Sequence, residues 1–260
     1  IGVHRIGPRL GWVPATLFAL NHSLLTWSFG GLETPLFLFL LLLGAYGLFV
    51  RPTRWAVCAF ALMALTRPEG YLFLLAGAPY AWGISPRHRS PSARWLPAIL
   101  AGLLVGGHLA FKLAYYGSLL PNTFYAKVCF DVEQLPRGFQ YLGAALTSYA
   151  MLVPAAFFLL FCPGDRRLRT SLLATLGSYG TYVIYTGGDP LPGYRLALPL
   201  LPLGWLAVVT LMRHLPRSTT AATAVVVGLL MLNSASHGLP GAPKGGAFEH
   251  FRRDKVADCG

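Results

Sequence analysis

Four short polar segments interrupt an otherwise apolar chain, and they carry the residues best able to bind or transform a ligand. The chain has 260 residues, of which 55% are hydrophobic and 12% are charged. Ionisable groups in or near a membrane are costly, and they usually persist where they pair or line a hydrated cavity. The four segments are WSFGGLETP at 27–35, LTRPEG at 65–70, YYGSLLPNTFYAK at 115–127 and GGDPLPGYR at 187–195.

Three of these segments contain a cation suited to a phosphate. A guanidinium presents a planar fork of donors that matches phosphate oxygens, and an ammonium supplies a compact charge. The candidates for binding a lipid phosphate are Arg67, Lys127 and Arg195. Two alternatives stay open, because Arg67 can instead pair with Glu69 or cap the turn, and Arg195 can form an ordinary salt bridge with Asp189.

The same segments contain groups suited to sugar hydroxyls. Carboxylates and amides orient hydroxyls, and aromatic faces pack against sugar rings. Glu33 has an alternative interpretation, because a carboxylate that opens a helix interacts favourably with the positive end of the helix dipole. The candidate substrate-positioning residues are Glu33, Glu69, Asp189, Asn122 and Tyr125.

The cysteine and histidine patterns predict neither a metal site nor a cofactor, although a divalent metal stays open. No CxxC pair occurs, and no histidine lies near a cysteine at metal-ligand spacing. The DVE sequence at 131–133 is typical of a solvated acidic pair, and His22 and His108 are expected to make hydrogen bonds between helices. The four cysteines are Cys58, Cys129, Cys162 and Cys259.

The elements that must position these residues are apolar helices. Mean hydropathy is +0.54, and apolar stretches of about 15 to 22 residues recur, near the length that crosses a bilayer. We therefore expect an all-α fold, a polytopic transmembrane bundle of about nine helices. The expected helices lie near 10–26, 34–50, 55–66, 70–83, 95–116, 140–162, 170–186, 194–212 and 219–234.

The charges predict the orientation of this bundle. The net charge is +12, but the arginines lie between apolar spans, as in cytoplasmic loops, which argues against nucleic-acid binding. The arginine loops all fall on the inner side if 55–66 and 70–83 form a short hairpin turning at TRPEG. A single kinked span is the rejected alternative. This topology places all four polar segments at the outer ends of helices.

The ordered sequences GGLETPLF, LTRPEGYLFL, YYGSLLPNTFYAK and GGDPLPGYRLALPLLPL resemble the multi-spanning GT-C glycosyltransferases. The likeness is greatest to the mycobacterial terminal β-1,2-arabinofuranosyltransferases. It implies transfer of a sugar from a polyprenyl-phosphate donor to an envelope glycan or lipid acceptor, on the extracytoplasmic side of the bacterial inner membrane. Arg67, Lys127 and Arg195 would then stabilise the charge growing on the departing lipid phosphate.

The resemblance also implies that the chain is part of a longer protein. It places the general base in an acidic loop upstream of Ile1, so no catalytic residue is assigned. Residues 1–234 are expected to form the transmembrane region, and 235–260 to begin an extracytoplasmic C-terminal region. The alternative functions are a transporter or flippase for a lipid-linked envelope precursor, or an inactive fragment.

Overall fold

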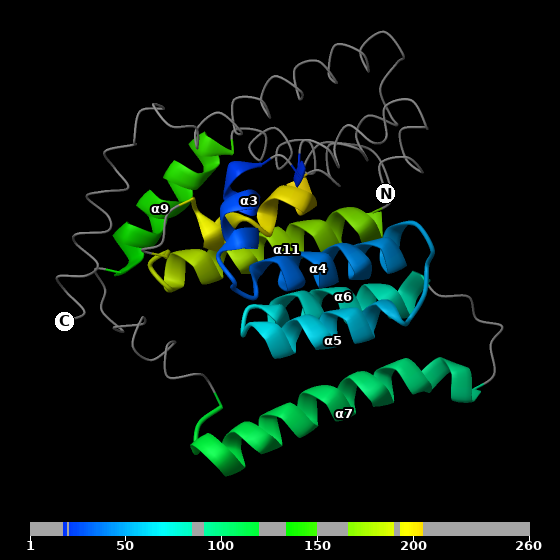
Figure 1. The fold of residues 1–260 in the computed structure, drawn as a ribbon. Coiled ribbons are helices and arrows are strands. Elements are labelled where there is room, and N and C mark those ends of the chain that lie inside the picture. The colour runs from blue at the N-terminus through cyan, green and yellow to red at the C-terminus, as the bar shows by residue number, and fades with distance from the viewer. Residues whose placement is uncertain are drawn as a thin grey trace, which may run out of the picture. The chain divides into compact units, whose positions relative to one another are not determined.

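Helices make up all of the regular structure in the part of the chain that the structure describes. The computed structural model describes residues 18–19, 21–84, 91–119, 134–149, 166–189 and 193–204. Every element within these ranges is a helix (Figure 1). The predicted all-α class is therefore confirmed. The chain divides into two compact units: unit 1 comprises Ile1–Leu32 and Val128–Gly260, and unit 2 comprises Glu33–Lys127.

The helices of unit 2 agree with the sequence predictions to within a few residues. Proline lies near the start of two of them: Pro35 is in the first turn of α4, and Pro68 lies between α5 and α6. Proline is tolerated in the first turn of a helix, because the N–H that it lacks would have no partner there. The four helices are α4 (Thr34–Phe49), α5 (Ala56–Thr66), α6 (Gly70–Ile84) and α7 (Pro91–Tyr116).

Close packing against Phe60 holds α4, α5 and α6 together. A Cβ atom on Gly44 of α4 would lie 2.5 Å from the Phe60 ring, and one on Gly77 of α6 would lie 2.6 Å from it. At the far end of α5, a Cβ on Gly70 would lie 2.5 Å from Ala64. Residue numbers thus rise along α6 as they fall along α5, so these helices are antiparallel. The described residues thus contain the predicted pair of helices joined at TRPEG rather than one continuous helix, whereas the position of this turn on the outer side of a membrane stays a prediction.

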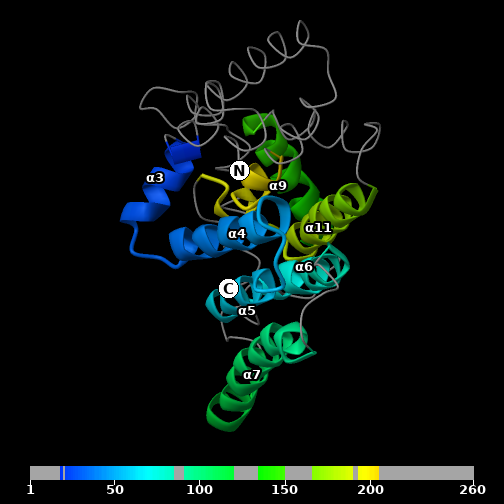
Figure 2. The same cartoon turned by 90° about the vertical axis from the view of Figure 1, so that its right-hand side faces the viewer.

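Because the helices are antiparallel, charged residues of unit 2 lie at both ends of the helix bundle. The start of α4, the end of α5 and the start of α6 lie at one end, and this places Glu33 close to Arg67. Arg51 and Arg54 lie at the other end, in the turn between α4 and α5. Figures 1 and 2 both show α4, α5 and α6 side by side, and α7 also packs against α5.

Unit 1 contains helices from three distant parts of the sequence. Asn21 caps the first of them, because its side chain accepts a hydrogen bond from the Leu24 N–H at 3.2 Å. The helices α9 and α11 pack against each other, and Gly138 allows contact with the backbone of Ile184. The helices are α3 (His22–Phe29), α9 (Gln134–Ser148), α11 (Arg166–Tyr185) and the 3-10 helix η1 (Arg195–Ala197), after which an apolar helix runs to Gly204.

The predicted boundaries in unit 1 differ from the observed ones at several points. The helix α9 begins at Gln134 and ends at Ser148, against a predicted range of 140–162, and α11 begins at Arg166, a few residues before the predicted start at 170. The first residues of α9 and α11 are polar, and hydropathy therefore did not reveal these starts, because a backbone can be helical before the sequence becomes apolar. The helix predicted at 10–26 is interrupted at Asn21, which is extended and caps α3, and α3 continues to Phe29. Residues 205–260 lie outside the described residues, and with them the predicted helix 219–234 and the tail 235–260.

One described helix is long and apolar enough to cross a membrane. This segment is Trp95–Tyr116 of α7, with 22 residues. Three other apolar helices, Thr34–Phe49, Ala56–Thr66 and Arg195–Gly204, are shorter. At 1.5 Å per residue, even the longest of these three covers only about 24 Å of a core about 30 Å thick. The multi-pass arrangement therefore stays a prediction.

Candidate functional site

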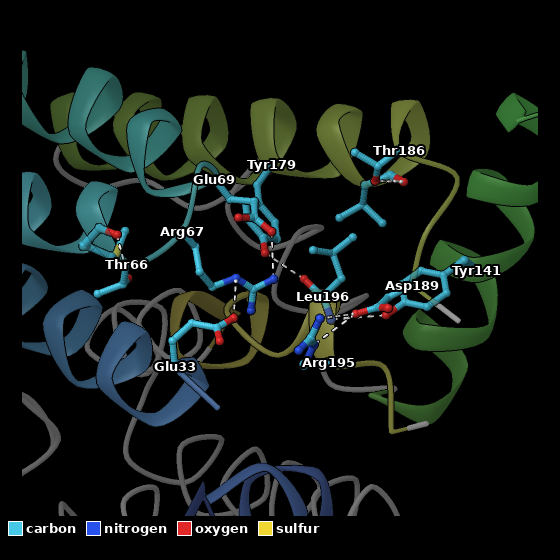
Figure 3. A network of polar contacts seen from close by, with 12 residues as sticks. Glu33, Thr66, Arg67, Glu69, Tyr141, Tyr179, Thr186, Asp189, Arg195 and Leu196 are labelled. Carbon is cyan, nitrogen blue, oxygen red and sulfur yellow. Dashed lines mark hydrogen bonds and ion pairs between the residues drawn. The ribbon is translucent and has the colours of Figure 1, made fainter. Parts of the chain in front are cut away.

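Asp189 and Arg195 form a buried ion pair in unit 1. The Asp189 Oδ2 atom accepts a hydrogen bond from Arg195 Nε at 3.0 Å and lies 2.9 Å from Arg195 Nη2 in the same ion pair. Asp189 is 3% exposed and Arg195 is 7% exposed. Figure 3 shows the two side chains pointing toward each other. The ordinary salt bridge, one of the two interpretations of this segment, is therefore present.

The backbone around this pair turns where the sequence supplies glycine. Gly187 and Gly188 have φ angles of 66° and 77°, and they end α11 by donating to the carbonyls of Ile184 and Val183. Such left-handed glycines satisfy the last carbonyls of a helix. Asp189 follows this cap directly. A Cβ atom on Gly188 would overlap the Tyr141 ring, so the glycine also permits the contact between the turn and α9.

Three buried tyrosines hold the segment that carries Arg195. Tyr179 donates to the Leu196 carbonyl at 2.8 Å, and the Leu196 N–H donates to the Tyr141 hydroxyl at 3.3 Å. The Tyr149 hydroxyl lies 3.0 Å from the Gly193 carbonyl and 3.0 Å from Ser23 Oγ. A phenol has one proton to donate, so Tyr149 donates to the carbonyl and accepts from Ser23. These bonds fix the backbone on both sides of Arg195.

Trp27 of α3 adds a buried donor beside Arg195. The Arg195 guanidinium carbon lies 5.1 Å from the centroid of the Trp27 ring. Trp27 is 8% exposed, and its Nε1 atom has no hydrogen-bond partner among the described residues. A buried donor without a partner costs about 1–3 kcal/mol. An N–H next to a guanidinium therefore offers a place for an oxygen-rich ligand group.

Arg67 organises a second cluster, which lies within unit 2. Its Nη2 atom donates to Glu69 Oε1 at 2.7 Å, and its Nε atom lies 3.7 Å from Glu33 Oε1. Arg67 and Glu69 are 6% and 5% exposed, whereas the Glu33 side chain is 37% exposed. The guanidinium also lies over the Phe37 ring, 5.3 Å from its centroid. The pairing interpretation of Arg67 is confirmed, and Glu33 contributes as well.

The TRPEG turn positions this cluster. Pro68 disfavours a helical conformation in the residue before it, and Arg67 is accordingly extended, with φ −147° and ψ 143°. The helix α5 therefore ends at Thr66. The Gly70 N–H then donates to the Arg67 carbonyl at 2.9 Å and starts α6. Only Pro68 separates Arg67 from Glu69 in the sequence, so their side chains meet within the turn itself.

Several buried polar atoms in this part of unit 2 have no hydrogen-bond partner among the described residues. They are Thr34 Oγ1, Glu69 Oε2 and the Tyr71 hydroxyl oxygen. Buried polar atoms are nearly always satisfied in native proteins, so such atoms call for water, an ion or a ligand. Glu69 Oε2 can only accept when the carboxylate is ionised, whereas the two hydroxyls can donate or accept. A ligand with several hydroxyl groups matches this set.

The structure thus places five of the predicted site residues and groups them in two clusters. Glu33, Glu69 and Arg67 meet in unit 2, and Asp189 and Arg195 meet in unit 1. The other candidates, Asn122, Tyr125 and Lys127, lie outside the described residues.

The two clusters differ in formal charge. The Arg67 cluster combines one cation with two carboxylates, which favours hydroxyls over a phosphate. The Asp189–Arg195 pair is neutral and has the Trp27 donor beside it.

Sequence reasoning missed Tyr141, Tyr149 and Tyr179. Each lies in an expected helix, where a tyrosine looks like any other interior or interfacial residue. Trp27 was within a quoted segment but was given no role.

Among the described residues, no group of three or more His, Cys, Asp or Glu side chains lies together. The carboxylates of the two clusters each face an arginine. No family model matches the chain, and no curated protein or solved structure matches it.

Proposed function

We propose that this chain belongs to a membrane glycosyltransferase of the GT-C type. It would move a sugar from a polyprenyl-phosphate donor to a glycan or lipid acceptor of the cell envelope, on the extracytoplasmic face of the bacterial inner membrane. The observation that carries the proposal is Glu69, whose carboxylate is buried, held on one oxygen by Arg67 and unsatisfied among the described residues on the other.

The Arg67 cluster supports the sugar-binding part of the proposal. Arg67 holds Glu69 in one orientation, and Glu69 Oε2 then accepts a hydrogen bond from a sugar hydroxyl. The hydroxyls of Thr34 and Tyr71 give further polar contacts in the same unit. Matching these buried groups with ligand hydroxyls removes a penalty of about 1–3 kcal/mol per group, which favours a polyhydroxylated ligand over an apolar one.

The Asp189–Arg195 pair supports the lipid-phosphate part. Asp189 fixes the guanidinium, and the tyrosines fix the backbone around it. Trp27 Nε1–H adds a second donor beside this cation. Donors that are oriented in advance stabilise charge that develops on a leaving group, because they need no reorganisation during the reaction. The general base is not assigned to any of these residues.

The membrane setting has independent support from hydropathy. The helix over Trp95–Tyr116 is long enough to span a bilayer, and most of its surface is exposed. Three shorter apolar helices accompany it. A polar site at the ends of apolar helices suits a donor whose sugar phosphate lies at the membrane surface while its polyprenyl chain remains in the lipid.

The test is sugar transfer in reconstituted vesicles by the longer protein that contains this chain, because the expected general base lies upstream of Ile1. That protein is inserted into lipid vesicles with radiolabelled polyprenyl-phosphate arabinose or mannose and an envelope-glycan acceptor, and labelled product is measured. We expect saturable donor binding and product formation, both reduced in the Arg195→Ala variant. Near-normal turnover in Arg195→Ala would remove this residue from the mechanism. Translocation of the labelled lipid without product would identify a transporter or flippase instead.

A further inference from the structure

Arg54 is a buried cation for which unit 2 contains no counter-charge. It lies in the turn between α4 and α5 and is 6% exposed. Its Nε atom is buried and has no hydrogen-bond partner among the described residues. The acidic residues of the sequence between 33 and 127 are Glu33 and Glu69, and both lie beside Arg67. A carboxylate of this unit therefore does not compensate Arg54.

The aromatic contact of Arg54 offsets only part of its desolvation. The guanidinium carbon lies 5.0 Å from the centroid of the Trp82 ring, a cation–π contact. Buried charges are otherwise paired or bound to ions, because an isolated charge is strongly disfavoured away from water. The helix α5 also begins at Ala56, and its N-terminal end carries a partial positive charge. Both effects favour an anion at this position.

The surroundings of Trp82 indicate the source of this anion. The rings of Trp82 and Trp95 have centroids 4.8 Å apart, and Trp95 is 53% exposed. Trp95 is also the first residue of the apolar segment of α7 that is long enough to span a membrane. Tryptophan is enriched where apolar chains meet lipid headgroups, so the Arg54 guanidinium lies beside residues of the kind found at headgroup level.

We propose that Arg54 and Trp82 form a binding site for a phosphate group, supplied by the headgroup of an anionic membrane lipid. The guanidinium binds two phosphate oxygens through its planar fork, and Trp82 holds the fork in place. The site is separate from the Arg67 cluster, since Arg54 lies just before the start of α5 and Arg67 lies just after its end. It does not depend on whether the protein transfers a sugar.

The experiment measures lipid binding by the full chain in micelles of a neutral detergent. Isothermal titration calorimetry follows the addition of short-chain phosphatidylglycerol, with phosphatidylcholine as the zwitterionic comparison. The wild-type chain is expected to bind one equivalent of phosphatidylglycerol, and Arg54→Ala to weaken this binding at least about tenfold, the loss expected for a charge-assisted hydrogen-bonded contact. The matched control is Arg51→Ala, which removes an exposed arginine from the same turn and should leave the affinity within about twofold.

Two results overturn the proposal: equal affinity in wild type and Arg54→Ala, or an equal loss in Arg51→Ala, which shows general attraction to basic residues. Arg54→Lys controls for misfolding of the alanine variant, because lysine keeps the positive charge at this position. It should retain the helical circular dichroism of the wild type and still bind several-fold more weakly, since an ammonium lacks the fork. Inorganic phosphate distinguishes the sources. If inorganic phosphate binds as tightly as phosphatidylglycerol, the site belongs to free phosphate. If inorganic phosphate binds much more weakly than phosphatidylglycerol, the site belongs to the lipid. If neither ligand binds, the proposal is overturned.

Discussion

The Tyr149 hydroxyl lies 3.0 Å from the Gly193 carbonyl and joins the residue after α9 to the turn that precedes Arg195. The two residues are 44 positions apart in the sequence. The same hydroxyl lies 3.0 Å from Ser23 Oγ, so three distant segments of unit 1 meet at one phenol. The backbone before Arg195 is strained, because Tyr194 has a positive φ of 49°. Tertiary hydrogen bonds therefore help to keep Arg195 in place.

Tyr149→Phe should lower the free energy of unfolding by about 1–3 kcal/mol, because it leaves the Gly193 carbonyl and the Ser23 hydroxyl without their phenol partner. The ring itself stays, so packing is preserved. Thermal or denaturant unfolding in detergent, followed by circular dichroism, measures the change. Tyr185→Phe is the control, since Tyr185 is 46% exposed and should change stability by less than about 0.5 kcal/mol. Equal effects of the two variants would contradict this role of Tyr149.

Gly188→Ala should be strongly destabilising. Gly188 has a φ of 77°, and a Cβ atom there would overlap the Tyr141 ring, so the variant combines left-handed strain of about 1–2 kcal/mol with a steric clash. Gly180→Ala in α11 is the matched control. A Cβ atom on Gly180 meets nothing within 4 Å, and alanine is the better helix former there by about 1 kcal/mol. The two changes should therefore shift the unfolding temperature in opposite directions.

Glu69→Gln should destabilise unit 2 more than Glu33→Gln. Glu69 is buried and bonds Arg67 at 2.7 Å, and loss of one partner of a buried ion pair costs about 3–5 kcal/mol when nothing replaces it. Glu33 is 37% exposed and lies at 3.7 Å, so its loss should cost less than about 1 kcal/mol. Because Glu33 remains beside Arg67, we expect the loss of unfolding free energy in Glu69→Gln to lie near the lower end of this range, at about 3 kcal/mol. Unfolding curves of both variants give the order, and the reverse order would show that Glu33 is the main partner.

The role of the Asp189–Arg195 pair can be separated from its contribution to stability. Asp189→Ala alone should destabilise by about 3–5 kcal/mol, because it leaves Arg195 buried without this carboxylate. The double variant Asp189→Leu, Arg195→Met removes both charges and should regain most of that stability. If the pair binds the donor phosphate, the double variant still fails to transfer sugar. Transfer by a stable double variant would show that the pair is structural only.

The helices of unit 2 were predictable because their apolar runs are bounded by residues that stop helices. Pro68 and Gly70 separate α5 from α6, and Pro35 lies in the first turn of α4. The starts of α9 and α11 were missed because their first turns are polar, as at Arg166. Hydropathy measures burial in an apolar environment, whereas a helix needs only backbone hydrogen bonds.

The sequence by itself determined that this chain is helical and apolar, that Arg67, Glu69 and Asp189 lie in turns between apolar elements, and that Arg195 opens the next helical segment. Local chemistry was enough there, because proline and glycine act on the backbone nearest to them. Only the tertiary structure decided that Glu33 joins Arg67, that three tyrosines hold the Arg195 segment and that Arg54 is buried without a carboxylate of its own unit. Those relationships depend on how distant segments pack, and side-chain types alone do not encode that packing at short range.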